Sequence, residues 1–452
     1  MDFIKPGPEF LKTILFAFQV ISSLVVRVPW NALSNLTANV VANHPTHPGT
    51  PPHRLRTQPL KALYIFHELV WWPLRFSWWV LSNISPDRRA RPSWSFEKAV
   101  AVRILRRLEI ITGRIGALYF LADHRTVSRG KDISISWVDP APASFVNALL
   151  ATWSTAAHVA QARIPGYWLS KSESSIPTAS PARQGEKIIY HLHGGAYILF
   201  SASPRDFVAG VGEGLLEHAP SSVQRAFTLE YRLSKAAPQE PANAFPAALL
   251  DALAGYAFLV TTLGFASSDI VLAGDSAGAN LALALTRYLA EHPSLGLRPP
   301  GALLLLSPWA DLSDSHADGA NADVDYIGGR RGGTMTYARA AFLGPQNALG
   351  GGELMRGRYV SPGSVDPRSE AKDASYASWP RTMVVSGGAE ALSGSIEVLV
   401  GRMRRDMGED RVRWYIAQDA VHDFLALWPL RVWEPERSDT LREVGAWMET
   451  QI

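Results

Sequence analysis

The sequence predicts an α/β fold with a mostly parallel central sheet flanked by helices, on the strength of two observations. From residue 186 onward, short and almost continuously apolar runs alternate with segments of helical periodicity, as expected for strands buried on both faces of a parallel sheet. In addition, the glycine-rich residues 274–278 lie between one of these runs and a helical segment, which indicates a sharp turn from strand to helix.

The apolar runs are the predicted strands, and helical segments separate several of them. The strands are expected over residues 187–192, 225–231, 269–273, 302–306, 382–386 and 412–416. Helices are expected between them, for example over residues 246–263 and 277–292. Because 452 residues exceed one ordinary domain, an appended part is expected. The expected division is a hydrophobic helical region over 1–95, a helical cap segment over 96–180 and the α/β domain over 181–452, with a cap insertion around 313–375.

The composition excludes several classes of protein and site. Apolar residues make up 47% of the chain and charged residues 19%, which is enough apolar side chain for a packed core. The net charge of +3 is too small to indicate a nucleic-acid partner. Because the chain has no cysteine, disulfides, thiolate catalysis and cysteine-ligated metal centres are all excluded. The composition gives no indication of the oligomeric state.

The N-terminal third contains hydrophobic segments that are unusual for an α/β domain. Residues 13–26 form an uncharged, mostly apolar run, which is shorter than the roughly 20 residues needed to cross a bilayer. No convincing cleavage site follows, so this run is expected to be a retained anchor and not a removable signal peptide. Residues 60–81 are rich in Trp and apolar residues but are interrupted by charges and a proline, which indicates a broken helix at an interface.

A basic amphipathic helix is predicted over residues 96–111, next to these Trp-rich segments. This combination suits an anionic membrane surface, so we expect a membrane-associated protein of the endoplasmic reticulum or another endomembrane. The alternative is a helical cap that packs on the α/β domain and leaves its arginines solvated, and both interpretations can hold together.

Residues 274–278, Gly-Asp-Ser-Ala-Gly, fit the pattern G-x-S-x-G, and their context makes Ser276 the predicted nucleophile. The pattern alone is weak, but a buried-strand run precedes it and a helical segment follows it. Both flanking glycines are expected because such a sharp turn leaves no room for a Cβ atom at these positions. The N-terminus of the following helix favours negative charge near the serine. The alternative is a glycine-rich turn with an incidental serine.

His193-Gly194-Gly195-Ala196 directly follows the first predicted strand of the α/β domain and is the predicted oxyanion loop. Adjacent glycines allow backbone N–H groups to point at a substrate oxygen that becomes negative. The expected donors are the N–H of Gly194 or Gly195, with Ala196 left open, together with that of Ala277. His193 is expected to order the loop by hydrogen bonding.

His422 follows the last predicted strand, at the edge of the sheet where ligands bind in open α/β folds, and is the predicted general base. Among the other histidines, His316 is the least implausible substitute. Glu390 lies about 30 residues before His422, in the order serine, acid, histidine, and is the predicted orienting carboxylate. Glu397 is the alternative, whereas Asp423 is too close in sequence to reach the ring well.

Taken together, these motifs resemble the hormone-sensitive-lipase branch of the α/β-hydrolases, and specifically its fungal members, over about residues 186–447. The matching motifs are His193-Gly194-Gly195, Tyr231-Arg232-Leu233-Ser234, Phe245-Pro246-Ala247-Ala248-Leu249, residues 274–278, Ser307-Pro308-Trp309-Ala310-Asp311-Leu312 and His422-Asp423-Phe424. The resemblance implies an α/β-hydrolase fold and hydrolysis of esters without a cofactor or metal. It also implies a helical cap, formed by N-terminal and inserted segments, that shapes the substrate pocket.

The chain departs from the pattern of this family at three places. Ala196 stands where a third glycine is common, and Glu390 stands where the family often has Asp. A second acidic residue usually found a few positions later is replaced around Ser393 and Gly394. The N-terminal third is similar to membrane-associated fungal relatives, including steryl acetyl hydrolases.

The expected function is that of a serine carboxylesterase that works through an acyl-serine intermediate. The expected substrate is a small hydrophobic ester, with a short acyl group on an apolar alcohol such as a sterol or a secondary metabolite. Tyr326 and Tyr337, from the cap insertion, are expected near the pocket. Transfer of the acyl group to an alcohol and a non-catalytic binding protein of the same fold remain alternatives, and a peptidase is disfavoured.

Overall fold

An eight-stranded, mostly parallel sheet forms the centre of the protein. The computed structural model describes residues 54–116 and 133–452, except 314, 317, 318, 320, 329–332 and 345–351. The strand order is β1-β2-β4-β3-β5-β6-β7-β8. The strands are β1 (Ser134–Val138), β2 (Ile164–Ser170), β3 (Lys187–Leu192), β4 (Val223–Leu229), β5 (Ile270–Asp275), β6 (Ala302–Leu306), β7 (Arg381–Gly387) and β8 (Val412–Ala417). The predicted α/β architecture is therefore confirmed.

Strands β1 and β2 are antiparallel to their neighbours and were not predicted from the sequence. They lie at one edge of the sheet, where β1 is mostly half-buried and β2 contains both Pro165 and Gly166. Neither strand has the continuous apolar run that marks a strand buried on both faces. The sheet consequently begins well before residue 181.

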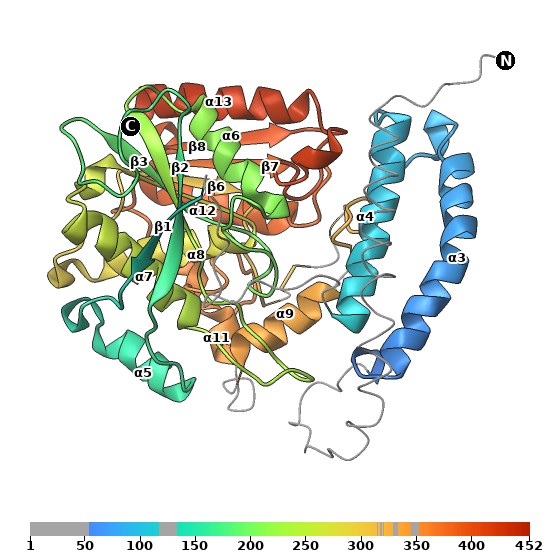
Figure 1. The fold of residues 1–452 in the computed structure, drawn as a ribbon, viewed down its shortest axis with the longest axis horizontal. Helices are drawn as coiled ribbons and strands as arrows, with labels where there is room; N and C mark the ends of the chain where they lie inside the picture. The colour runs from blue at the N-terminus through green and yellow to red at the C-terminus, as the bar shows by residue number, and fades with distance from the viewer. Residues whose placement is uncertain are drawn as a thin grey trace.

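Helices cover both faces of the sheet, as Figure 1 shows. The helices of the described residues are α3 (Leu60–Ser82), α4 (Phe96–Ile115), α5 (Ala148–Ala156), α6 (Gly210–His218), α7 (Ala247–Ala257), α8 (Ala277–Glu291), α9 (Thr334–Leu343), α11 (Gly352–Arg356), α12 (Ser393–Met407) and α13 (Glu436–Gln451). Helices α6 and α13 pack together on one face, and α7, α8 and α12 pack on the other.

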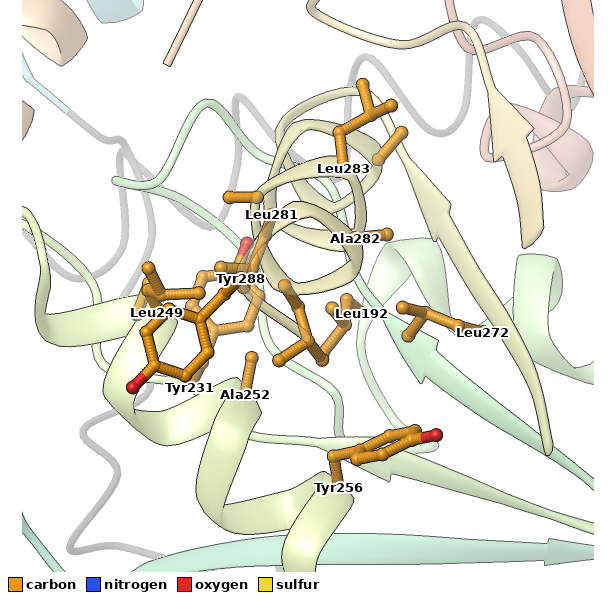
Figure 2. Packing of buried hydrophobic residues seen from close by; sticks show 14 of the residues in the cluster. Leu192, Tyr231, Leu249, Ala252, Tyr256, Leu272, Leu281, Ala282, Leu283 and Tyr288 are labelled. Carbon is orange, nitrogen blue, oxygen red and sulfur yellow. The ribbon is translucent and has the colours of Figure 1, made fainter. Parts of the chain in front are cut away.

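Alternating side chains of the parallel strands fill the two halves of the core. On β3, Ile188, Tyr190 and Leu192 point to the layer of α7 and α8, whereas Ile189 points to the layer of α6 and α13. Figure 2 shows the first of these layers, where α7 and α8 pack against each other on the same face of the sheet. Each fully buried leucine or isoleucine contributes about 1.5–3 kcal/mol by leaving water. The end of β5 and the start of α8 are therefore held on both sides by close-packed side chains.

The N-terminal helices α3 and α4 form an antiparallel pair beside the α/β domain (Figure 1). Ser95 caps the start of α4, because its side chain accepts the N–H of Lys98, and the side chain of Lys98 forms an ion pair with Glu436 of α13. Helix α3 packs on α4 through Trp72 and its neighbours. The buried Glu68 accepts hydrogen bonds from Arg75 of the same helix and from Arg107 of α4. Both packing and charge therefore connect the pair.

The expected endomembrane location is wrong on the evidence of the residues that the structure describes. Within residues 54–116 and 133–452, with the gaps given above, no helix combines the length and the apolar character needed to cross a bilayer. Helix α3 has 23 residues, but His67, Glu68 and Arg75 interrupt its apolar character. Glu68 and Arg75 take part in the polar contacts that hold α3 together and against α4. The expected anchor over residues 13–26 lies outside the described residues.

Candidate active site

Ser276 occupies a strained turn between β5 and α8, as the sequence predicts. Its φ angle is 51°, in the left-handed region that residues other than glycine rarely adopt. Two backbone contacts hold the turn: the N–H of Ser276 donates to the carbonyl of Leu306 over 2.8 Å, and its carbonyl accepts the N–H of Trp309 over 3.0 Å. The turn is thus fixed by the end of the neighbouring strand β6 and the chain that follows it.

The two glycines of the turn are required by close backbone contacts. A Cβ atom at Gly274 would overlap the carbonyl group of Gly278. A Cβ atom at Gly278 would overlap the carbonyl group of Leu192, at the end of β3. Neither obstacle is a flexible side chain, so a larger residue would push α8 away from the sheet.

The structure brings Ser276, His422 and Glu390 together at the carboxyl edge of the sheet. His422 follows β8, and its Nε2 atom lies 2.9 Å from Ser276 Oγ. Its Nδ1 atom lies 3.4 Å from Glu390 Oε1, which is longer than an ordinary hydrogen bond. Glu390 is completely buried, and its other oxygen accepts the hydroxyl of Ser307 and the N–H of Gly387 over 2.8 and 2.7 Å. Each side chain therefore comes from a different loop.

The alternatives for acid and base lie apart from this arrangement. Glu397 is exposed to solvent on α12. His316 donates from Nε2 to the carbonyl of Gly363 over 2.8 Å, so its ring is engaged in the inserted segment. Tyr326 lies beside His422, with 6.3 Å between ring centroids. Tyr337 instead donates its hydroxyl to the carbonyl of Ala236.

The residues after β3 form a tight loop beside Ser276. The ring of His193 donates from Nδ1 to the carbonyl of Gly194 over 2.7 Å and stacks on Tyr231, so it orders the loop. Gly195 and Ala196 both have positive φ angles, 110° and 53°. The N–H of Gly194 donates to Asp275 Oδ2 over 2.7 Å, an engagement that the sequence did not predict. The N–H of Gly194 is therefore already hydrogen-bonded to a side chain of the protein.

Asp275 and Asp423 form a buried pair of carboxyl groups beneath the serine. Asp275 accepts hydrogen bonds from His191 Nε2 over 2.9 Å and from Gly194, and its carboxyl group is also hydrogen-bonded to that of Asp423. Burial raises the pKa of Asp275 to about 7, and burial together with the neighbouring Asp275 raises the pKa of Asp423 well above its usual range. Burial and the closeness of the two carboxyl groups therefore favour a proton within this pair.

Carboxylates dominate the electrostatic environment of His422. Burial by itself would lower the pKa of His422, but the adjacent Glu390, Asp423 and Asp325 outweigh burial and raise it to about 9. The neutral ring is the form that can accept the Ser276 hydroxyl at Nε2 while it points an Nδ1–H toward Glu390. Among the described residues, no group of three or more His, Asp or Glu side chains is arranged to hold a metal ion.

The loops that carry Glu390 and His422 are also held by the segment that precedes α4. The guanidinium group of Arg91 donates to the carbonyl of Gly388 and to the carbonyl of Gln418, the latter over 2.6 Å. The indole N–H of Trp94 donates to the carbonyl of Asp419 over 2.9 Å. No sequence motif marks these residues, because a single Arg or Trp in a basic, aromatic segment is inconspicuous.

The sheet, the strained serine turn and the histidine behind β8 define the chain as an α/β-hydrolase. Residues 189–426, more than half of the chain, match the family described as having the alpha/beta hydrolase fold, and the chain belongs to that family. The α/β-hydrolase membership that the sequence motifs predict is therefore confirmed.

Known proteins of this class are similar to the chain in sequence or fold. An acetyl-hydrolase of Streptomyces hygroscopicus is 35% identical over 150 residues, which cover 33% of this chain and 44% of that protein. The esterase LipU of Mycobacterium tuberculosis is 27% identical over 310 residues, which cover 66% of this chain and 92% of LipU. The crystal structure of a hormone-sensitive lipase from a metagenome library has a TM-score of 0.50 at 23% identity, covering 72% of this chain and 88% of that one.

Replacement of Arg91 by Met should lower both stability and ester turnover. The loops that carry Glu390 and His422 would lose the hydrogen bonds that Arg91 donates to them from the N-terminal segment. Each lost charge-assisted hydrogen bond costs about 2 kcal/mol of unfolding free energy. Thermal unfolding and hydrolysis of p-nitrophenyl acetate measure the two effects. Arg89→Met is the matched control, since Arg89 donates to the carbonyls of Asn83, Ile84 and Trp94 within the N-terminal segment. Equal turnover in the two variants would contradict this role for Arg91.

Proposed function

We propose that the protein is a serine carboxylesterase in which Ser276, His422 and Glu390 act as nucleophile, base and orienting acid. The observation that carries the proposal is the 2.9 Å separation between His422 Nε2 and Ser276 Oγ, with Glu390 behind the other ring nitrogen. Nucleophile and base within hydrogen-bonding distance, with a third group orienting the base, is the arrangement that activates a serine.

The reaction follows from this arrangement. As Ser276 Oγ attacks the carbonyl carbon of the ester, its proton passes to His422 Nε2. The tetrahedral intermediate then collapses, and the leaving alkoxide takes the same proton, which leaves an acyl group on Ser276. Water then attacks the acyl-serine with His422 again as the base, and the carboxylic acid departs. Glu390 holds the Nδ1–H tautomer and stabilises the imidazolium that forms in each half of the reaction.

The proposed donors to the oxyanion are the N–H groups of Gly195 and Ala277. Ala277 is the first residue of α8, where a backbone N–H has no partner within the helix and the helix dipole favours negative charge. Gly195 lies in the positive-φ part of the loop after β3. The N–H of Gly194, in contrast, already donates to Asp275, which argues against Gly194 as a donor.

The proposed substrate is a short-acyl ester of a hydrophobic alcohol. The acetyl-hydrolase from Streptomyces hygroscopicus and the putative acetyl-hydrolase LipR of Mycobacterium tuberculosis, 34% identical over 125 residues, support a short acyl group. Ala196 has a positive φ angle and puts a methyl group where the family commonly has a glycine. We expect this methyl group to reduce the space for the acyl group beside Ser276. Tyr326, next to His422, offers an aromatic surface to an apolar leaving group.

Replacement of Ser276 by Ala should abolish both turnover of p-nitrophenyl acetate and labelling by a fluorophosphonate probe, because both need the activated hydroxyl. Mass spectrometry of the labelled wild-type protein should place the adduct on Ser276. Unchanged thermal unfolding of the variant would show that the fold is intact. An adduct on another residue, or none on the folded wild-type protein, would refute the proposal.

Replacement of Glu390 by Gln should reduce kcat by about 10³- to 10⁴-fold, because the neutral amide no longer favours the required tautomer and imidazolium. Steady-state kinetics on the same ester measure the effect. Glu397→Gln is the control, since this side chain is exposed on α12 and should keep wild-type kinetics. If Glu397→Gln lost activity and Glu390→Gln kept it, Glu397 and not Glu390 would be the orienting acid.

The pH dependence of kcat/KM should report the titration of His422 in the free enzyme. Because the neutral ring is the base, activity rises as pH increases through its pKa. Neighbouring carboxylates raise this pKa to about 9, so the midpoint of the acid limb should lie well above about 6.5, the ordinary value of imidazole. Initial rates at substrate concentrations far below KM give the profile directly. A midpoint at or below the ordinary value would show that the carboxylates around the ring are protonated.

A further inference from the structure

We propose that Asp325 is a positioning residue for the reaction, which sets the acid and the base relative to each other from within the inserted segment. The inference rests on the proposed function of Ser276, His422 and Glu390. Asp325 lies between β6 and α9 in sequence, outside every motif that carries the family resemblance. No relative or motif assigns it a role.

The carboxylate of Asp325 binds next to both the acid and the base. Its Oδ2 atom accepts the N–H of Ala391, the residue after Glu390, over 2.7 Å. Its Oδ1 atom accepts the N–H of His422 itself over 3.3 Å and that of Tyr326 over 2.7 Å. One rigid side chain thus joins the loop after β7 to the loop after β8.

This bridge lies where small displacements have large effects. The distance from Glu390 Oε1 to His422 Nδ1 is 3.4 Å, so the contact is close to the limit of a hydrogen bond. A misplacement of about 1 Å in a reacting group can cost 10²-fold in rate. Backbone bonds from Gly388 to Ala417 and from Ala389 to Ala420 also join the two loops, but they lie before the acid and before the base. Asp325 holds the residues adjacent to the chemistry.

The carboxylate also acts on the charge of His422. Asp325 is completely buried and its carboxylate oxygens accept from backbone N–H groups, so its charge is weakly screened. The titratable groups that face the His422 ring are Glu390 after β7, Asp423 in its own loop and Asp325 from the inserted segment, with Asp275 at the end of β5 next to Asp423. Tyr326 lies against the same ring. Burial raises the pKa of Asp325 to about 6, so it is ionised at neutral pH and favours the imidazolium.

A positioning role of Asp325 and a role in folding alone predict different effects on the kinetics. A residue that only folded the inserted segment would alter stability without moving the titration of His422. A residue that acts as proposed should change kcat and also shift the midpoint of the pH profile, because a negative charge beside the ring is lost. Loss of this charge favours the neutral ring, so the midpoint moves to lower pH.

The experiment compares Asp325→Asn with Asp311→Asn in the full-length protein. Asp311 lies just before the same inserted segment, in the motif Ser307–Leu312, and is also nearly buried. It accepts bonds from the backbone and hydroxyl groups of Ser313 and Ser315, over 2.5–3.0 Å, and these partners lie outside the loops of Glu390 and His422. It therefore controls for the loss of a carboxylate that orders this segment.

With p-nitrophenyl acetate as the probe, Asp325→Asn should lower kcat by about 10- to 100-fold with KM nearly unchanged. The midpoint of its acid limb should fall by about one pH unit. Asp311→Asn should keep the wild-type kcat and midpoint, even where thermal unfolding shows lower stability. An Asp325→Asn variant with the wild-type midpoint, or with kinetics equal to those of Asp311→Asn, would overturn the proposal.

A second variant keeps the test decisive if Asp325→Asn does not fold. Asp325→Glu retains the charge but displaces the acceptor oxygens by one methylene, so kcat should fall while the midpoint stays at the wild-type value. A wild-type kcat in this variant would refute the positioning role. Failure of the proposed function would look different, because wild-type protein itself would then neither hydrolyse the ester nor react with a fluorophosphonate.

Discussion

The contact between α8 and the end of β3 is the constraint on which the rest of the site depends. Gly278 lies so close to the carbonyl of Leu192 that no side chain fits between them. This contact seats the N-terminus of α8 directly above the sheet, next to the loop that begins at His193. The strained conformation of Ser276 follows, because the chain must leave β5 and enter α8 within one residue. Close packing of α8 against both the sheet and α7 keeps the helix in this position.

A cluster of buried carboxyl groups surrounds that turn and gives the site its electrostatic character. Several like charges in one buried region would repel each other strongly, so the cluster is stable only where protons or cations reduce its charge. Burial raises the pKa of both Asp275 and Asp423, which favours a proton within that pair, whereas Glu390 and Asp325 face the ring of His422. This environment stabilises a positive charge on His422, which is the charge that arises when Ser276 loses its proton. The same carboxylates that order the loops therefore also favour the transition state of the proposed reaction.

The sequence predicted those parts of the structure that depend on local pattern. Strands β3 to β8 were found from their continuous apolar runs, and the turn at Ser276 from its flanking glycines. The edge strands β1 and β2 were missed because they are short, partly exposed and interrupted by Pro165 and Gly166. The membrane location inferred from the N-terminal third was wrong because clusters of Trp and Arg also suit a helical pair that packs on a protein. Helix α3 has one side that packs on protein and one that faces outward. Its Glu68 is buried against α4, whereas its Trp78 is exposed.

The residues that sequence analysis did not find share a physical cause. Asp325 and Arg91 act through backbone N–H and carbonyl groups, which every residue has, so their partners leave no pattern in the sequence. Both reach the loops of Glu390 and His422 from segments outside the core motifs of the fold, one from the N-terminal region and one from the insertion after β6. Two segments outside the core motifs thus contact the loops that carry the proposed acid and base. A change in one of these segments can adapt the pocket to a new ester only if it preserves the polar contacts of Arg91 or Asp325. Without these contacts, the distance between acid and base would change together with the pocket.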